Sequence, residues 1–400
     1  MKITVVDSIM GSGKTSWALQ HVNEAPADQK FIYITPYLDE VQRVIATVTN
    51  RRFSEPNNAN SEGRKLRSLK ELIATERNIV ATHSLFQSAD DELIELLTDA
   101  GYTLLLDEVM DVIDRAPISA SDIRTLIDSG RIEVRDTRVY WISDDYTDGR
   151  FDDIKLLAKA GNLFVHRDNF FLWAFPPRVF QAFDEVIVMT YLFAAQVQRY
   201  YYDLHGMVYE YKSVTRRKDG DYELVEYDRR QEKREEVMCL IDVYDGPLNE
   251  YGDTYYALSS KRLRNYDADT LGRIQRNTYN YFRNICKAKG EEILWTTLKD
   301  CQNDLRGRGY AKSFVPVNIR ATNEFKDRWA LAYIFNQFLS PIERVFFEDR
   351  GISVDQDLLA VSDLLQWIWR SRIRVGQPIR LYLPSSRMRS LLIAWSKYEI

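Results

Sequence analysis

The N-terminal stretch Met1–Leu19 constrains the fold more than any other part of the chain. Ile3–Val6 is apolar and mostly β-branched, as is typical of a buried parallel strand. Ser8-Ile9-Met10-Gly11-Ser12-Gly13-Lys14-Thr15 follows with the spacing of a Walker A loop and leads into a predicted amphipathic helix. A chance glycine-serine turn would not need the Lys-Thr pair or the helix in this order. The stretch therefore predicts an α/β domain that binds nucleotide phosphates.

Each residue type in this loop has a physical task. Gly11 and Gly13 let the backbone curl so that successive N–H groups face one centre, and Lys14 brings a positive charge to the β- and γ-phosphates. Thr15 offers a hydroxyl to Mg²⁺, while Ser8 stands where the usual first glycine would be. The residues expected to contact ATP are Met10, Gly11, Ser12, Gly13, Lys14, Thr15 and Ser16.

Length and composition limit the remaining possibilities. The chain has 400 residues, of which 45% are hydrophobic, and this is enough for two cores of ordinary size. Its apolar runs are too short to span a bilayer, so no membrane association is expected. Its three cysteines, Cys239, Cys286 and Cys301, lack C-x-x-C spacing, which favours a reducing, cytoplasmic compartment. The net charge of -5 argues against a purely electrostatic nucleic-acid binder but is compatible with a motor that has one basic groove.

A second signal lies at Tyr102–Met110, YTLLLDEVM. An apolar strand ends there in Asp107 and Glu108, and adjacent acids at a strand end are costly unless a cation lies nearby. Mg²⁺-ATP would supply that cation: Asp107 would hold the metal, and Glu108 would orient and deprotonate the attacking water. An exposed acidic turn is the alternative, and it is weaker downstream of a Walker A loop.

Two further strand ends in the first half carry polar residues. Lys30–Thr35 is a predicted strand ended by Pro36, and a predicted helix with Arg43 follows. Asn78–Thr82 is a second predicted strand of this kind. His83 and Ser84 follow it, at a place where parallel sheets hold ligand-contacting loops. Without further context, each segment could equally be an ordinary strand-turn-helix connection, in which His83 would cap the next helix.

The middle of the chain predicts an insertion, at about 115–178. Arg131–Ile142 and Leu163–Trp173 have strand character and predict an antiparallel unit. Phe183–Phe193 then supplies another buried strand that includes Thr190. A domain junction is expected near 195–205, giving one domain at 1–198 and a second at 199–400.

The second half predicts another α/β domain. Gly290–Thr297 reads as a strand, and Arg320–Phe325 contains the polar pair Thr322-Asn323. In Leu364–Arg374 (LLQWIWRSRIR), three polar residues recur at i, i+4 and i+8 and are therefore expected on one helical face: Gln366, Arg370 and Arg374. A basic amphipathic helix with Trp367 in the core is the alternative.

Taken together, these motifs resemble those of the DEAD/DEAH-like superfamily 2 helicases, particularly compact phage-encoded members with C-terminal segments similar to QWIWRS. The resemblance implies two RecA-like P-loop domains, each a mainly parallel sheet flanked by helices, with the β-rich insertion in the first. It also implies ATP and Mg²⁺ as cofactors. Met10–Ser16 and Asp107-Glu108 match helicase motifs I and II.

The resemblance also assigns roles that the residues alone leave open. Nucleic-acid contacts are implied for Pro36, Arg43, His83, Ser84, Thr322 and Asn323. Thr190 would couple the γ-phosphate to the nucleic-acid site, although the family's Ser-Ala-Thr is Met-Thr-Tyr here. Gln366, Arg370 and Arg374 match motif VI, whose arginines act as fingers, with Trp369 replacing its glycine and the last arginine one residue late.

The function that this predicts is an ATP-dependent helicase or translocase of superfamily 2. Its partner would be nucleic acid, DNA rather than RNA, as a single strand or fork, in phage replication or recombination and with other proteins of those processes. The location would be the cytoplasm of the host. Two alternatives remain: a viral DNA-packaging ATPase with a nuclease in its second half, for which Asp242 could start a metal cluster, and a nucleotide-gated binding switch that does not unwind.

Overall fold

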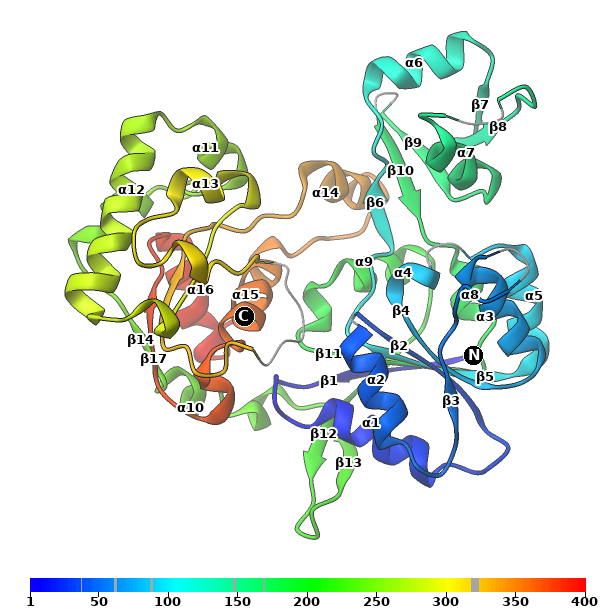
Figure 1. The fold of residues 1–400 in the computed structure, drawn as a ribbon, viewed down its shortest axis with the longest axis horizontal. Coiled ribbons are helices and arrows are strands. Elements are labelled where there is room, and N and C mark those ends of the chain that lie inside the picture. Colours follow the sequence, from blue (N-terminus) through cyan, green and yellow to red (C-terminus); the bar gives the residue numbers. More distant parts are fainter. Residues whose placement is uncertain (37, 61–62, 87–88, 147–148, 168–169, 318–323) are drawn as a thin grey trace. The chain divides into compact units, whose positions relative to one another are not determined.

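The computed structural model describes residues 1–400 apart from 37, 61–62, 87–88, 147–148, 168–169 and 318–323 (Figure 1). The chain forms two compact units. Unit 1 consists of Met1–Asp7, Gly13–Val225 and Pro341–Val354, and unit 2 of Ser8–Ser12, Glu226–Ser340 and Asp355–Ile400. No helix in the described ranges is long and apolar enough to cross a membrane.

Unit 1 is built on an eight-stranded sheet with the order β13-β12-β1-β11-β5-β2-β4-β3. The strands are β1 (Lys2–Asp7), β2 (Lys30–Thr35), β3 (Phe53–Ser54), β4 (Asn78–Thr82), β5 (Tyr102–Asp107), β11 (Glu185–Thr190), β12 (Glu210–Arg216) and β13 (Tyr222–Glu226). From β12 to β3 the neighbouring strands pair in parallel. The carboxyl ends of β1, β11, β5, β2 and β4 therefore lie at one edge of the sheet.

Helices cover both faces of this sheet, and so its central strands are apolar on both sides. Val5 and Val6 of β1 belong to different core clusters, one on each face. Helices α1 (Lys14–Glu24) and α2 (Leu38–Thr47) supply Trp17 and Val41 to the Val6 face. On the Val5 face lie α3 (Lys65–Ala74), α4 (His83–Phe86), α5 (Asp91–Ala100), α8 (Pro177–Gln181) and α9 (Val197–Leu204).

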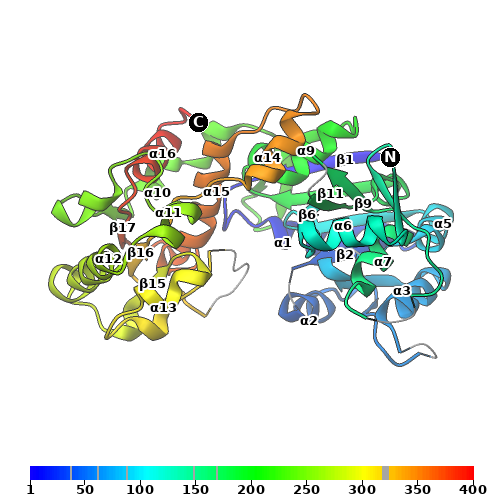
Figure 2. The same cartoon turned by 90° about the horizontal axis from the view of Figure 1, so that it is seen from above.

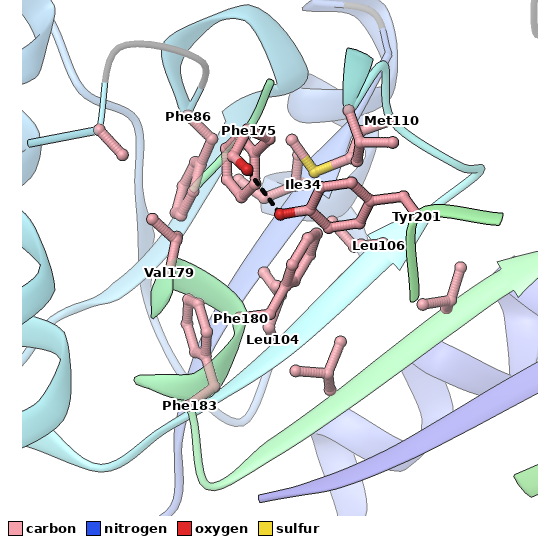
Figure 3. Close-up of a cluster of buried hydrophobic side chains, with 14 of the residues drawn as sticks. Ile34, Phe86, Leu104, Leu106, Met110, Phe175, Val179, Phe180, Phe183 and Tyr201 are labelled. Carbon is pink, nitrogen blue, oxygen red and sulfur yellow. Dashed lines mark hydrogen bonds between the residues drawn. The ribbon is translucent and has the colours of Figure 1, made fainter. Parts of the chain in front are cut away.

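The core on the Val5 face contains many aromatic side chains. In Figure 3, Phe180 and Phe183 lie beside Leu104 of β5, and the hydroxyl of buried Tyr201 donates a hydrogen bond to the carbonyl oxygen of Phe175. The hydroxyl is thus satisfied while its ring packs among apolar groups. This core fixes β5, which ends in Asp107.

An antiparallel sheet with the order β6-β10-β9-β8-β7 follows β5, as the insertion prediction required. Its strands and helices are β6 (Ile113–Arg115), α6 (Ala120–Asp128), β7 (Ile132–Arg135), β8 (Arg138–Trp141), α7 (Asp152–Lys159), β9 (Leu163–His166) and β10 (Phe170–Ala174). Each segment predicted as one strand is a pair of strands, and α7 lies between the two pairs. Apolar content alone did not reveal the turns.

A late segment of the sequence belongs to unit 1. Helix α14 (Pro341–Glu348) places Phe346 and Phe347 in the same core as β1 and β5, with the Phe347 ring 5.6 Å from that of Tyr200 on α9. Figure 2 shows α14 beside α9. Arg167 and Asp349 form an ion pair at 3.0 Å. Burial, with help from Asp114 and Asp111, raises the pKa of Glu343 to about 7.

Unit 2 has a four-stranded parallel sheet with the order β14-β17-β16-β15. Its strands and α-helices are α10 (Arg234–Met238), β14 (Ile241–Val243), α11 (Ser260–Asn265), α12 (Ala268–Asn280), β15 (Ile293–Thr296), α13 (Gln302–Leu305), β16 (Ala330–Tyr333), α15 (Gln356–Ile368), β17 (Ile379–Tyr382) and α16 (Ser386–Ser396). The buried guanidinium of Arg387 joins α16 to Asp357 of α15 at 2.6 Å. The predicted fold class, two mainly parallel α/β sheets flanked by helices with a β-rich insertion in the first, is confirmed.

The boundary between the two compact units does not fall at residue 198, where the sequence predicted the end of the first domain. Unit 1 continues to Val225 because β12 adds to the sheet beside β1, with Val5 opposite Tyr211. Pairing between strands about two hundred residues apart leaves no local mark in the sequence.

Candidate nucleotide site at the strand ends

The turn between β1 and α1 has the backbone that a phosphate-binding loop needs. Gly11 and Gly13 have φ angles of 79° and 102°, in the region that side chains disfavour. A Cβ on Gly13 would also lie 2.1 Å from Cε1 of Tyr222 on β13, so any other residue here would displace that ring as well as strain the backbone. Helix α1 begins at Lys14, which is 9% exposed. Met10, Gly11 and Ser12 thus lie in the turn, and Lys14, Thr15 and Ser16 form the first helical turn.

Asp107 lies beside Thr15 at the end of β5. The Thr15 hydroxyl is 3.2 Å from Oδ2 and 3.4 Å from Oδ1 of Asp107, and the hydroxyl of buried Tyr33 donates to Oδ2 at 3.0 Å. The structure therefore brings together the two residues predicted to hold Mg²⁺, 92 positions apart in sequence. Tyr33, on β2, was not predicted as part of this group.

The Asp107 carboxyl shows why a cation suits this place. Burial, and next the charge of Glu108, raise its pKa to about 6. Hydrogen bonds from Tyr33 and Thr15 oppose the shift without cancelling it. The donor set of one carboxylate and one hydroxyl consists of hard oxygen ligands, which Mg²⁺ prefers. Thr15 and Asp107 fit that ion.

Glu108 is held in an unusual conformation. Its φ of 73° lies in the left-handed region, its N–H donates to the carbonyl oxygen of Met189 at 2.9 Å, and its Oε2 accepts from the hydroxyl of Thr190 at 3.0 Å. Thr190 is fully buried at the end of β11. A non-glycine residue with positive φ costs energy, and such strain gathers at functional sites. The predicted base and the predicted coupling residue are thus in direct contact.

Two residues that support these strand ends were missed. Asp7 accepts hydrogen bonds from the N–H groups of Leu192 and Phe193 at 2.8 and 2.9 Å, tying the end of β1 to the segment after β11. Gln198 of α9 accepts from the N–H of Met110 at 2.9 Å, just beyond Glu108. An acid at the end of an apolar strand was a visible signal for Asp7, whereas nothing near Gln198 in sequence marks it.

The candidate nucleic-acid contacts of unit 1 follow β2 and β4, at the same edge as Asp107. Pro36 comes directly after β2, while Arg43 lies on α2 with its guanidinium 3.0 Å from Glu40. His83 begins α4, and the hydroxyl of Ser84 lies 3.2 Å from that of Thr82. Thr322 and Asn323, the predicted contacts of the second domain, lie outside the described residues.

The expectation that Gln366, Arg370 and Arg374 share one helical face is wrong. Helix α15 ends at Ile368, and the hydroxyl of Ser371 donates to the Ile368 carbonyl oxygen at 2.7 Å, closing the last turn. Arg374 lies in a separate 3-10 turn, Arg372–Val375. Gln366 is therefore on the helix, Arg370 follows it with 7% exposure, and Arg374 is exposed.

Comparison with known proteins identifies matching domain families and similar solved structures. The YonV middle domain matches residues 113–173, which coincide with the antiparallel sheet, and the YonV C-terminal Rossmann-like domain matches residues 235–396 in the second half. Among solved structures, the chain is similar to S. tokodaii Xpd4 (TM-score 0.49, 12% identity, covering 100% of this chain and 94% of that one). It is also similar to the DUF1998 helicase MrfA bound to DNA and AMPPNP (TM-score 0.37, 10% identity, 100% and 48%).

The similarity to one relative runs through nearly the whole sequence. The chain is 41% identical over 406 residues to the SPbeta prophage-derived uncharacterized protein YonV of Bacillus subtilis (strain 168), covering 98% of each. With the two domain matches, this extent shows that the chain belongs to the YonV family.

Proposed function

We propose that this protein is a nucleic-acid-dependent ATPase that moves on DNA in the manner of superfamily 2 helicases. The observation that carries the proposal is the meeting of Thr15, Asp107, Glu108 and Thr190 at the carboxyl ends of neighbouring parallel strands. Together with Lys14 we call these residues the strand-end site. A phosphate-binding turn, a metal-binding pair and a candidate base on adjacent strands are what ATP hydrolysis needs.

Each residue has a task in this scheme. The turn 8–13 and Lys14 hold the phosphates, and Glu108 orients the attacking water and takes its proton. Mg²⁺, held by Thr15 and Asp107, would neutralise charge that develops on the phosphoryl oxygens. Because Thr190 donates to Glu108, loss of the γ-phosphate would change the hydrogen bonding of the base and of β11 together. That shared hydrogen bond is our candidate for coupling hydrolysis to movement.

Nucleic acid is proposed to cross the ends of β2 and β4, where Pro36, Arg43, His83 and Ser84 lie. Thr322 and Asn323 are proposed as the corresponding contacts of the second half. Arg370 is proposed as the arginine finger, with Gln366 and Arg374 as lesser participants. DNA, as a single strand or fork, is proposed over RNA, in phage replication or recombination in the cytoplasm of the host. The prophage-derived relative supports a phage origin.

The packaging ATPase has less support as an alternative. Asp242, which would begin its nuclease cluster, instead forms an ion pair with Arg380 at 3.2 Å on the neighbouring strand β17. The residue opposite Asp242 on β17 is therefore a cation and adds no carboxylate to a metal cluster. A metal-dependent nuclease assay on intact plasmid tests this directly, since cleavage would restore the alternative.

The experiment that tests the proposed function is ATP turnover measured with no nucleic acid, single-stranded DNA, duplex DNA and RNA in parallel. Stimulation of hydrolysis by DNA is expected. Nucleotide binding without hydrolysis under every condition would instead leave a nucleotide-gated switch. A strand-displacement assay on forked DNA then separates unwinding from translocation along one strand.

A further inference from the structure

An open pocket of about 520 Å³ lies on unit 2, and none of the residues that line it has been assigned a role so far. Its lining comes from helix α12 and the loop 306–311, which follows α13. Figure 1 labels α12 and α13. The lining residues are Gln275, Arg276, Tyr279, Arg306, Gly307, Arg308 and Ala311. We call this cavity the arginine pocket. Its volume is in the range of small-molecule sites.

The charge of the lining is of one sign. Three arginines line the pocket, no acid does, and all three are exposed. Among the residues that the structure describes, Arg276, Arg306 and Arg308 form no ion pair. Neighbouring Arg273, by contrast, lies 3.8 Å from Glu250. Three guanidinium groups around one cavity repel each other, and an anion placed among them relieves that repulsion.

The loop that carries two of the arginines is held firmly. The Gln275 side-chain amide of α12 donates to the carbonyl oxygen of Arg306 at 2.5 Å. The buried Tyr310 donates its hydroxyl to the carbonyl oxygen of Leu305 at 2.6 Å. A Cβ on Gly307 would lie 2.5 Å from Cε1 of Tyr310, so the loop packs this closely only because a glycine separates Arg306 from Arg308. The arginines thus start from an ordered backbone, which lowers the entropy lost on binding.

An aromatic ring completes the lining. Tyr279 and Arg276 are three residues apart on α12, which places them on the same face of the helix, and Tyr279 is 38% exposed. Guanidinium groups bind phosphate oxygens with several donors, and an exposed tyrosine ring can stack on a base. The combination of cations with a stacking surface is the arrangement by which proteins hold single strands without reading their sequence.

We propose that the arginine pocket binds the phosphodiester backbone of single-stranded nucleic acid, with one base stacked on Tyr279. The inference rests on the proposed function and deepens it by naming a contact surface of unit 2 within the described part of the chain. Free polyphosphates and nucleotides carry the same phosphate oxygens, and the experiment separates these sources from a strand.

The test compares the full-length protein with its R276A/R306A/R308A variant. A control variant, R124A/R229A/R230A, loses the same charge at exposed arginines outside the pocket. Affinity for a fluorescent oligothymidylate is measured across a range of salt concentrations. Each phosphate contact to a single strand adds about 0.7 to the slope of log affinity against log salt, so the pocket variant should lose about 2 from this slope and the control far less.

Two further arms identify the ligand. Replacing Tyr279 by Ala should weaken oligonucleotide binding by about tenfold, while Tyr279→Phe should retain it, because stacking needs the ring and not the hydroxyl. Pyrophosphate and ATP are added as competitors to the Lys14→Ala protein. Neither pyrophosphate nor ATP should displace the oligonucleotide, even when the competitor is added well above the concentration of oligonucleotide phosphate groups. Displacement by either small anion would overturn the proposal in favour of a small-anion site.

The failures of the two proposals can be told apart. If the pocket and control variants had equal oligonucleotide affinity and equal salt slope, the proposed role of the arginine pocket would be refuted. DNA-stimulated ATP hydrolysis could still be observed, so the proposed ATPase would stand. A reduced slope in a protein that never hydrolyses ATP would support the pocket and refute the ATPase. Basal hydrolysis, measured without nucleic acid, should be unchanged in the pocket variant, and circular dichroism melting verifies its fold.

Discussion

The strand-end site sets two adjacent carboxylates near Lys14, whereas the arginine pocket gathers three guanidinium groups, and the two are built in different ways. Asp107 is fixed by hydrogen bonds from Thr15 and buried Tyr33, and its pKa is raised to about 6. The guanidinium groups of the pocket are exposed, and it is the loop backbone beneath them that is fixed.

This difference indicates that the strand-end site serves catalysis and that the arginine pocket serves binding. A partly buried charge is weakly screened, so its position governs chemistry at a single ligand atom. Exposed charges are screened by salt and contribute affinity without strict geometry. Substitutions at the strand ends should therefore change turnover, and substitutions in the pocket should change the salt dependence of binding.

The largest expected effect is at the strand-end site itself. Lys14→Ala should abolish ATP hydrolysis, because the backbone turn cannot replace the charge that opposes the developing γ-phosphate charge. Glu108→Gln should lower turnover by about 10² to 10⁴-fold while nucleotide still binds, since shape is kept and the base is lost. Turnover and nucleotide affinity are measured together. Wild-type turnover in the Glu108→Gln protein would remove Glu108 from catalysis.

Arg370→Ala should lower DNA-stimulated turnover by about 10³-fold and spare nucleotide affinity, as expected of an arginine finger. Arg370→Lys should not rescue, because an ammonium lacks the planar set of donors. Arg372→Ala is the neighbouring control: its Nε donates to the carbonyl oxygen of Pro378 at 2.6 Å, and its guanidinium lies over the Trp329 ring. Since Arg370 is buried, a melting curve must first establish that the variant folds. Normal stimulation in both the Arg370 and Arg374 alanine variants would refute the motif VI assignment.

Asp107→Asn should make the metal-free protein more stable, by up to about 3 kcal/mol near neutral pH. The pKa of Asp107 is raised from 3.8 to about 6, so ionising this carboxyl costs more in the folded state. The cost is absent below pH 3.8, grows as pH rises towards 6, and is complete above 6. Urea unfolding at several pH values measures it. An asparagine variant that is less stable at pH 7.5 would show that the carboxylate is not under electrostatic strain.

The smallest effect is expected at Arg43. If Arg43 contacts one phosphate, Arg43→Ala should lower the salt slope for single-stranded DNA by about 0.7 and weaken binding severalfold. Its ion pair with Glu40 is exposed, so the fold should tolerate the change. An unchanged slope would restrict nucleic-acid binding in unit 1 to other strand ends and sharpen the contrast with the arginine pocket.

The residues of the strand-end site could be named from sequence because their signals are local. A run of apolar residues that ends in Asp107 and Glu108 predicts both a buried strand and an acidic site at the end of that strand. Tyr33 and Gln198 could not be found in this way, because each bonds a partner far away in the sequence and lies in a strand or helix with no polar signal of its own. The arginine pocket was also missed, because helix α12 and the loop 306–311 are separated in the sequence, although Arg-Gly-Arg-Gly at 306–309 is a visible local signal.

Helix α15 shows where periodicity misleads. Gln366, Arg370 and Arg374 keep a helical spacing, yet no helix spans all three. Beyond Ile368 the N–H of Arg372 donates to the carbonyl oxygen of Arg328 instead of continuing the helix, and the Ser371 hydroxyl bonds the Ile368 carbonyl oxygen. No glycine or proline marks this helix end in the sequence. Spacing predicts a shared face only where the helix persists.

The place of α14 in unit 1 bears on how the protein is made. A ribosome releases the chain from its N-terminus, so the sheet of unit 1 emerges long before Phe346 and Phe347, which complete its core. Until residue 354 has emerged, the surface around Tyr200 that those rings cover stays open to water and to other chains. Unit 1 therefore depends for its completion on a segment synthesised after most of unit 2. Cutting the gene between the units would produce an N-terminal half that cannot close its own core.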